Sequence, residues 1–238
     1  MIFLWGVRKI DIVQNLMNFS LTRQEATIYL SLLREGDLNG YEVSKLTGIS
    51  RSNAYNALAS LVDKGAAYKI EGNSVVYTPV SINEFCSNKI RFMEDMKKNL
   101  IKNIPEKREE SNGYITIKGK NHIIDKMKNI ILCAKERIYI SLSQNLLDIV
   151  VQELRELAKN KIKIVIITDK KINFDDAIFY YCNKKSNQIR IIVDSKIVLT
   201  GDVEDTCLYS SNNNLVEVFK EALTNEIKLI ELNKGRDK

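Results

Sequence analysis

Two capped helices joined by a three-residue turn constrain the fold of this chain more than any other feature. Asn39 is placed to cap a short helix over 42–46, and Thr47-Gly48-Ile49 then turns the chain tightly. Ser50 caps the next helix, which is predicted over 51–64. A helix, a short turn with a glycine and a second helix are the parts of a helix-turn-helix unit.

A further helix is predicted directly upstream, after an amphipathic stretch at 11–19. Thr22 and, three positions later, Glu25 make the pattern of a capping box, and Gly36 ends the helix. Its buried stripe is predicted to consist of Ala26, Tyr29, Leu30 and Leu33.

A hairpin is predicted downstream of the second helix. Two runs rich in β-forming residues, Ala67–Ile70 and 75–78, flank the turn Glu71-Gly72-Asn73-Ser74. A hairpin in this place is the wing of a winged helix-turn-helix, which the sequence predicts over 21–79.

The helix over 51–64 separates polar from apolar side chains. Its core-facing residues are predicted to be Ala54, Tyr55, Leu58, Leu61 and Val62. Its free face, which is predicted to extend as far as Ser60, carries arginine and asparagine, which can form paired hydrogen bonds with base edges in a major groove about 12 Å wide. We therefore expect base contacts from Arg51, Ser52, Asn53 and Asn56. The alternative is a polar face that is merely solvated.

Contacts with the DNA backbone are expected from residues around this helix. Phosphate contacts are predicted for Lys45, Lys64, Lys69 and Asn73, and Tyr41 is included among the DNA-binding residues. The net charge of +6 permits such binding. However, residues 1–80 carry eight Lys and Arg against seven Asp and Glu. Because affinity scales with the phosphates neutralised, we expect two copies to bind double-stranded DNA together.

One long helix is predicted over 81–107, between the two prolines of the chain. Cys86, Met93 and Leu100 recur at seven-residue intervals, whereas a second series with the same spacing is broken by Lys89 and Asn103. A homodimer is predicted to form through residues 81–111, with the two helices either antiparallel or parallel. The alternative is a solvent-facing spacer.

The C-terminal half alternates strands and helices, which predicts an α/β domain over 112–238. Strands are predicted at 114–118, 137–142, 162–168, 189–193, 197–200 and 207–210, and helices at 122–134, 145–160 and 215–230. Such folds bind ligands at the carboxyl ends of strands. The residues predicted to bind a small-molecule effector there are Ser141, Ser143, Thr168, Asp169 and Asp194.

The stretch over 191–201, read backward from Asp194, resembles the end of a phospholipase D half-site, where His-x-Lys is followed by four residues and then by Asp. In this chain Asn187 and Ile189 occupy the His and Lys positions. The histidine is the nucleophile of that chemistry, and neither asparagine nor isoleucine can replace it. The sole histidine, His122, lies on a predicted helix. We therefore expect a related fold without enzymatic activity.

Two stretches resemble the TrmB-type transcriptional regulators. They are Leu-Thr-x-x-Glu-Ala-x-x-Tyr-Leu-x-Leu-Leu over 21–33 and Ile-Ser-Arg-Ser-x-x-Tyr-x-x-Leu-x-x-Leu-x-x-Lys-Gly over 49–65. The resemblance implies a DNA-binding winged helix over 1–80, a coiled-coil helix and an effector domain of degenerate phospholipase D-like fold. Sugar binding is described for archaeal members, but no sugar-binding motif maps onto this sequence.

Two rival functions remain open. One is a phosphodiesterase or nuclease with a DNA-targeting domain, and the other is a DNA-bound interaction module without a ligand. The four cysteines lack the spacing of a zinc site or a disulfide framework, so neither a metal nor a cofactor is expected. No apolar run is long enough to span a membrane, which predicts a cytoplasmic protein.

Overall fold

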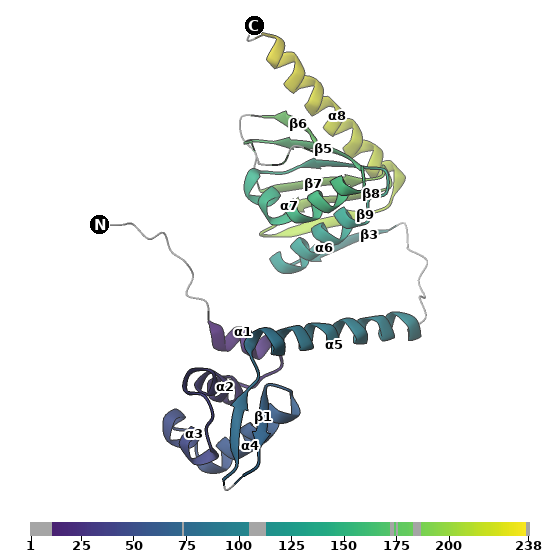
Figure 1. Ribbon diagram of the computed structural model, residues 1–238. Helices are drawn as coiled ribbons and strands as arrows, with labels where there is room; N and C mark the ends of the chain where they lie inside the picture. The colour runs from purple at the N-terminus through teal and green to yellow at the C-terminus, as the bar shows by residue number, and fades with distance from the viewer. Residues whose placement is uncertain are drawn as a thin grey trace, which may run out of the picture. The chain divides into compact units, whose positions relative to one another are not determined.

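The computed structural model describes residues 11–72, 74–104, 113–171, 174, 176–182 and 187–236, and of 234–236 it describes only the helical backbone. The chain divides into two compact units, an N-terminal unit over 1–107 and a C-terminal unit over 108–238 (Figure 1). The predicted dimerisation segment begins inside the N-terminal unit, and its end at 105–111 lies outside the described residues.

The N-terminal unit has the order of elements that the sequence predicted. Its helices and strands are α1 (Ile12–Asn18), α2 (Arg23–Glu35), α3 (Gly40–Thr47), α4 (Arg51–Asp63), β1 (Ala67–Ile70), β2 (Val76–Pro79) and α5 (Ile82–Asn103). Capping boxes begin α2 at Thr22 and α3 at Asn39, and Ser50 caps α4. Gly48 ends α3 in the left-handed conformation at φ 71°, where glycine avoids the strain of a side chain.

The buried stripe of α2 differs from the predicted one. Ile28 and Leu32 are fully buried beside Ala26 and Tyr29, whereas Leu30 is half-buried and Leu33 is exposed. Leu30 packs against the core, but the prediction of Leu33 as buried was wrong. Helix α2 is contacted by α1, α3 and α4, and residue spacing alone did not define the direction in which its buried side extends.

The wing forms as predicted. Strands β1 and β2 pair antiparallel from Ala67 opposite Pro79 to Ile70 opposite Val76. Leu38 adds a bridge to Tyr77 with two backbone hydrogen bonds of 2.8 and 3.1 Å, which ties the turn before α3 to the wing.

Helix α5 is anchored in the core of the N-terminal unit through Phe85, in its first turn, and continues beyond that core (Figure 1). Phe85 is 1% exposed and contacts the rings of Phe19 and Tyr29, and the hydroxyl of Tyr29 donates to the carbonyl of Val80 at 2.7 Å. After Lys89, every described residue of α5 is exposed. The start of α5 is therefore fixed to the winged helix.

The C-terminal unit is a seven-stranded mixed sheet with helices on both faces. Its elements are β3 (Tyr114–Lys118), α6 (Lys120–Leu132), β4 (Arg137–Ser141), α7 (Gln144–Lys159), β5 (Lys163–Thr168), β6 (Ile178–Tyr181), β7 (Gln188–Val193), β8 (Ile197–Asp202), β9 (Thr206–Ser210) and α8 (Asn213–Arg236). The strand order is β3-β9-β8-β7-β4-β5-β6, with β4, β5 and β6 parallel and the other neighbours antiparallel.

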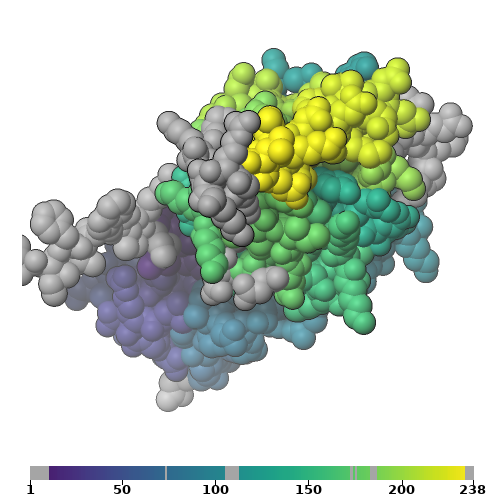
Figure 2. Space-filling view, turned by 90° about the horizontal axis from the view of Figure 1, so that it is seen from above, coloured from purple at the N-terminus to yellow at the C-terminus, as the bar shows by residue number. Residues whose placement is uncertain are grey.

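Alternating side chains of the strands explain the two faces. Ile164 and Ile166 of β5 join the core beneath α6 and α7, whereas Ile167 joins Val216 and Leu223 of α8 on the other face. Figure 2 shows α8, in yellow, on the outside of this unit. Strand β6, a short strand at the edge of the sheet, was not predicted from the sequence.

No helix among the described residues is long and apolar enough to cross a membrane.

Candidate DNA-binding surface and effector domain

The N-terminal end of α4 presents the polar face that the sequence predicted. Arg51, Ser52, Asn53 and Asn56 are all exposed, whereas Ala54 and Leu58 are completely buried. The Oγ of Ser50 accepts a hydrogen bond from the Asn53 N–H at 3.4 Å. The buried side of α4 therefore fixes the helix, and its opposite side is free to enter a DNA groove.

Arg51 is oriented by a residue of the preceding helix. Its guanidinium carbon lies 4.7 Å from the ring centroid of Tyr41 on α3, which is a cation–π distance. Tyr41 is 50% exposed. The pair joins α3 to the first residue of α4 and holds an arginine fork on the open surface.

Tyr55 also belongs to this surface, although it was predicted to face the core. The prediction was wrong, because Tyr55 is 49% exposed and its buried neighbours on α4 are Ala54, Ala57, Leu58 and Leu61. Its ring lies over Gly40, whose missing side chain makes room for it. Val62, which was predicted to face the core, is half-buried and packs against it. The cue in the sequence for the outward position of Tyr55 was Gly40, the glycine at the first helical position of α3.

The predicted phosphate-contacting lysines differ in what surrounds them. Lys45 is exposed on α3. Lys69 on the wing pairs with Glu71 at 2.5 Å, which raises the pKa of Lys69 and lowers that of Glu71. Lys64 is engaged by Glu25, as described next. Asn73 lies outside the described residues.

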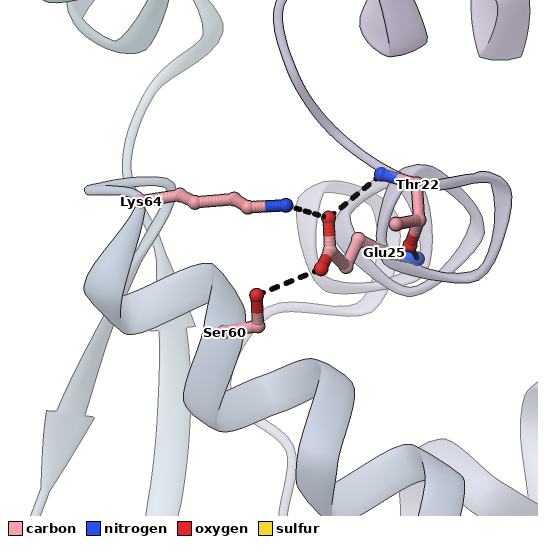
Figure 3. Close-up of polar contacts among 4 residues, drawn as sticks. All are labelled: Thr22, Glu25, Ser60 and Lys64. Carbon is pink, nitrogen blue, oxygen red and sulfur yellow. Dashed lines mark hydrogen bonds and ion pairs between the residues drawn. The ribbon is translucent and has the colours of Figure 1, made fainter.

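Glu25 anchors the far end of α4 (Figure 3). Its carboxylate accepts hydrogen bonds from Lys64 Nζ at 2.6 Å, Ser60 Oγ at 2.7 Å and the Thr22 N–H at 2.7 Å. Glu25 is 5% exposed. Burial alone raises the pKa of Glu25, but these hydrogen bonds outweigh it and hold the pKa below its ordinary value. Ser60 is therefore a structural partner of Glu25, and Lys64 is less available to phosphate than the sequence suggested.

In the C-terminal unit, four of the five predicted effector residues lie together. Strands β4 and β5 are adjacent and parallel, so Ser141, Ser143, Thr168 and Asp169 meet at their carboxyl ends. Asp169 accepts a hydrogen bond from the N–H of Gln144, the first residue of α7, at 2.9 Å. Ser143 Oγ and Thr168 Oγ1 are buried and have no hydrogen-bond partner among the described residues.

Asp194 lies at the opposite end of the sheet, so grouping it with those four residues was wrong. Strand β7 runs antiparallel to β4, and its carboxyl end therefore meets the beginning of β4. The Asp194 carboxylate accepts hydrogen bonds of 2.9 Å from the N–H groups of Lys135, Glu136 and Arg137. Burial raises the pKa of Asp194, but these backbone hydrogen bonds lower it more.

The positions that correspond to phospholipase D chemistry hold no comparable side chains. Ile189 is completely buried in the core, Asn187 is exposed, and His122 is exposed on α6. Across the described part of the chain, no cluster of three or more His, Cys, Asp or Glu side chains could hold a metal ion. None of the four cysteines, all of which are described, forms a disulfide bond.

Together these features define a winged-helix DNA-binding protein with a second, sheet-based unit. Residues 16–83 match the family of the sugar-specific transcriptional regulator TrmB, and residues 113–225 match the N-terminal subdomain of the TrmB effector-binding domain, EBD. The chain belongs to the TrmB family and is a DNA-binding transcriptional regulator.

Two relatives match most of this chain at 30% sequence identity. YrhO of Bacillus subtilis (strain 168) is 30% identical over 198 residues, which are 82% of this chain and 72% of YrhO. The HTH-type sugar sensing transcriptional regulator TrmBL1 of Pyrococcus furiosus is 30% identical over 183 residues, 74% of this chain. The matched part spans 51% of TrmBL1, about half its length.

Two solved structures that match this chain have low sequence identity to it. TrmBL2, an archaeal chromatin protein, is 19% identical with a TM-score of 0.40, and the match covers 90% of this chain and 96% of TrmBL2. Nuc, a phospholipase D family member from Salmonella typhimurium, is 17% identical with a TM-score of 0.34 over 48% of this chain and 93% of Nuc.

Proposed function

We propose that this regulator binds DNA as a dimer through the N-terminal end of α4, and that its C-terminal unit binds a small molecule without catalysing a reaction. The observation that carries the first part is Arg51 beside Tyr41, an arginine held at the start of an exposed polar helix face.

Bases are read by the exposed side chains of α4. Arginine matches guanine and asparagine matches adenine in paired hydrogen bonds, so Arg51 and Asn56 are the proposed determinants of sequence. Tyr55 adds an aromatic surface between them. Lys45 and Lys69 contact phosphates and position the domain.

A gel-shift titration on the upstream region of its own gene tests this assignment. The variant Arg51→Ala/Asn56→Ala is expected to lose affinity at every salt concentration, and Lys118→Ala, an exposed cation of the C-terminal unit, serves as the control. Equal binding by wild type and the double variant would contradict the role of α4.

The dimer is proposed to form through α5. Beyond the winged helix this helix exposes large apolar side chains on one side, Phe92 (59%), Met93 (59%), Met96 (41%) and Leu100 (57%), and Ile104 (60%) follows as its C-cap. An apolar face of this extent is typical of an interaction site. Residues 1–80 carry little net positive charge, so one copy alone is expected to bind DNA weakly, and a second copy supplies a second DNA-reading helix.

An effector site is proposed at the carboxyl ends of β4 and β5. The unpartnered hydroxyls of Ser143 and Thr168 can hydrogen-bond a polar ligand. A sugar is the first candidate, because TrmBL1 is named a sugar sensing regulator.

Thermal-shift measurements with glucose, maltose and trehalose test the effector site. A sugar at 100 times its Kd is expected to stabilise the protein by about 2.7 kcal/mol through linkage. Thr168→Val is expected to abolish the shift, and Thr116→Val, at an exposed position of β3, is expected to retain it. If no sugar produces a shift, a module without a sugar ligand is favoured.

The absence of catalysis is proposed from the residues at 187 and 189. Asparagine and a buried isoleucine offer no nucleophile for a phosphodiester. We expect no hydrolysis of bis(p-nitrophenyl) phosphate in the presence of a chelator. Hydrolysis that is abolished by Asp194→Ala at a temperature where the variant remains folded would support a phosphodiesterase instead.

A further inference from the structure

We infer that two α5 helices pair antiparallel, so that the C-terminal end of each lies beside the winged helix of the other. This inference rests on the proposed dimer and adds its orientation. Apolar side chains gather on one side of α5, because 100° per residue brings Phe92, Met93, Met96 and Leu100 to the same side of the helix, and Ile104 follows as its C-cap.

The charges along α5 are distributed unevenly. Residues 96–103 carry Lys97, Lys98 and Lys102 and no acid, whereas residues 82–95 carry three acids against two bases. A parallel pair would bring the two lysine-rich segments together. An antiparallel pair brings each of them to the acidic segment of the partner, where Glu94 and Asp95 lie.

The two polar residues that interrupt the apolar face favour the same orientation. Lys89, Met96 and Asn103 lie seven residues apart along one line of the helix. In a parallel pair in register, each Lys89 ammonium would face that of the partner subunit. In an antiparallel pair centred on Met96, Lys89 faces the asparagine at 103 of the partner subunit, because both are seven residues from the centre.

A cleft beside α5 provides a place for the end of the partner helix. It has a volume of about 330 Å³ and lies between Gly65, just after α4, and the start of α5, with Phe85 and Phe92 in its wall. With the centre at Met96, Leu100 of the partner subunit lies opposite Phe92, and Ile104 of the partner subunit lies opposite Asn88, which also lines the cleft. A parallel pair would leave the cleft open.

The orientation determines how far apart the two winged helices are attached. At 1.5 Å per residue, the two Ile82 residues of an antiparallel pair lie about 42 Å apart along the axis. This is comparable to the 34–36 Å between successive major grooves on one side of DNA. In a parallel pair the attachment points would be about 10 Å apart, the distance between helix axes.

Distances between spin labels in the full-length protein test the orientation. Each label is carried on a ketone-bearing amino acid, so that the four cysteines stay unchanged. It replaces Asn83 in one variant and Lys98 in another, both exposed and both away from the centre of the apolar face. For an antiparallel pair centred on Met96, we expect about 40 Å between labels at 83 and under about 30 Å between labels at 98.

The outcomes separate the orientation from the dimer itself. Short distances at both positions would show a parallel pair and overturn the antiparallel orientation, while the proposed dimer stands. Long distances at both positions would place the interface away from α5 and overturn the inference. A monomer in sedimentation, with no intermolecular distance at either position, would overturn the proposed dimer as well.

Discussion

The ring of Tyr55 on α4 occupies the space that a side chain on Gly40 of α3 would need. A Cβ atom at position 40 would overlap three ring carbons of Tyr55. Gly40 is buried, whereas Tyr55 is half exposed, so the contact links the beginning of one helix of the DNA-binding unit to the open face of the next.

Gly40→Ala is therefore expected to weaken DNA binding while leaving the stability of the fold nearly unchanged. The flexible Tyr55 ring can move toward solvent, and alanine is a better helix former than glycine, so the unfolding free energy should change by less than about 1 kcal/mol. The displaced ring alters the reading surface and weakens operator binding. Urea unfolding and gel shifts measure the two effects, and unchanged affinity would show that Tyr55 has no part in binding.

Arg51→Lys is expected to lose most of the contribution of Arg51 to DNA binding, even though the charge is kept. Lysine lacks the planar fork that matches guanine in two hydrogen bonds, and we expect a loss of about 1–3 kcal/mol on the cognate site. Tyr41→Ala removes only the contact that orients the guanidinium and should cost about 0.5–1 kcal/mol. Fluorescence anisotropy on cognate and scrambled duplexes measures both. A loss that is equal on the two duplexes would assign Arg51 to phosphate rather than to bases.

Glu25→Gln is expected to destabilise the N-terminal unit by about 2 kcal/mol at neutral pH, because the buried carboxylate loses its charge-assisted hydrogen bond with Lys64. Folding lowers the pKa of Glu25 below 4.5. Its ionised form therefore contributes fully above that pH, and the contribution disappears as the pH falls through the lower pKa of the folded state.

Hydrogen exchange of α4 amides between neutral pH and pH 3 measures this contribution. Wild type should lose protection on acidification, and Glu25→Gln should lose less. An exposed acid, Glu71, provides the control substitution Glu71→Gln. Identical pH profiles for wild type and Glu25→Gln would contradict a stabilising role of the ionised pair.

Asp194→Ala is expected to destabilise the C-terminal unit by about 1–3 kcal/mol, because three backbone N–H groups lose their acceptor. Residue 194 also has a φ of 49°, a conformation that asparagine tolerates better than alanine. Asp194→Asn should therefore cost less than Asp194→Ala in thermal unfolding. If both variants melt like wild type, the carboxylate is not structural.

Met93→Glu is expected to shift the protein toward monomer, since it places a charge on the exposed apolar face of α5. Arg91→Glu changes a charge on the opposite side of the helix and serves as the control. Analytical ultracentrifugation is expected to show at least a tenfold increase in the dimer dissociation constant for Met93→Glu alone. Equal effects of the two substitutions would point to charge rather than to the apolar face.

Short-range patterns in the sequence account for the local elements of this protein. Capping at Thr22, Asn39 and Ser50, and glycines at 36 and 48, define where helices begin and end through contacts within a few residues. The exposed polar side of α4 and the hairpin after it follow from the same patterns. For this reason the DNA-binding unit is predictable from the order of its residues alone.

Other features depend on contacts between residues that are far apart in the sequence, and only the tertiary structure determined them. The buried sector of α2 depends on which helices surround it, and Tyr55 faces outward because Gly40 admits its ring. Asp194 is separated from Thr168 because β7 runs antiparallel to β4, and strand direction is fixed by the order of the whole sheet. Glu25 reaches Ser60 and Lys64 across 35 and 39 residues. Periodicity cannot predict such pairings, because the free energy that selects them comes from burial of the complete core.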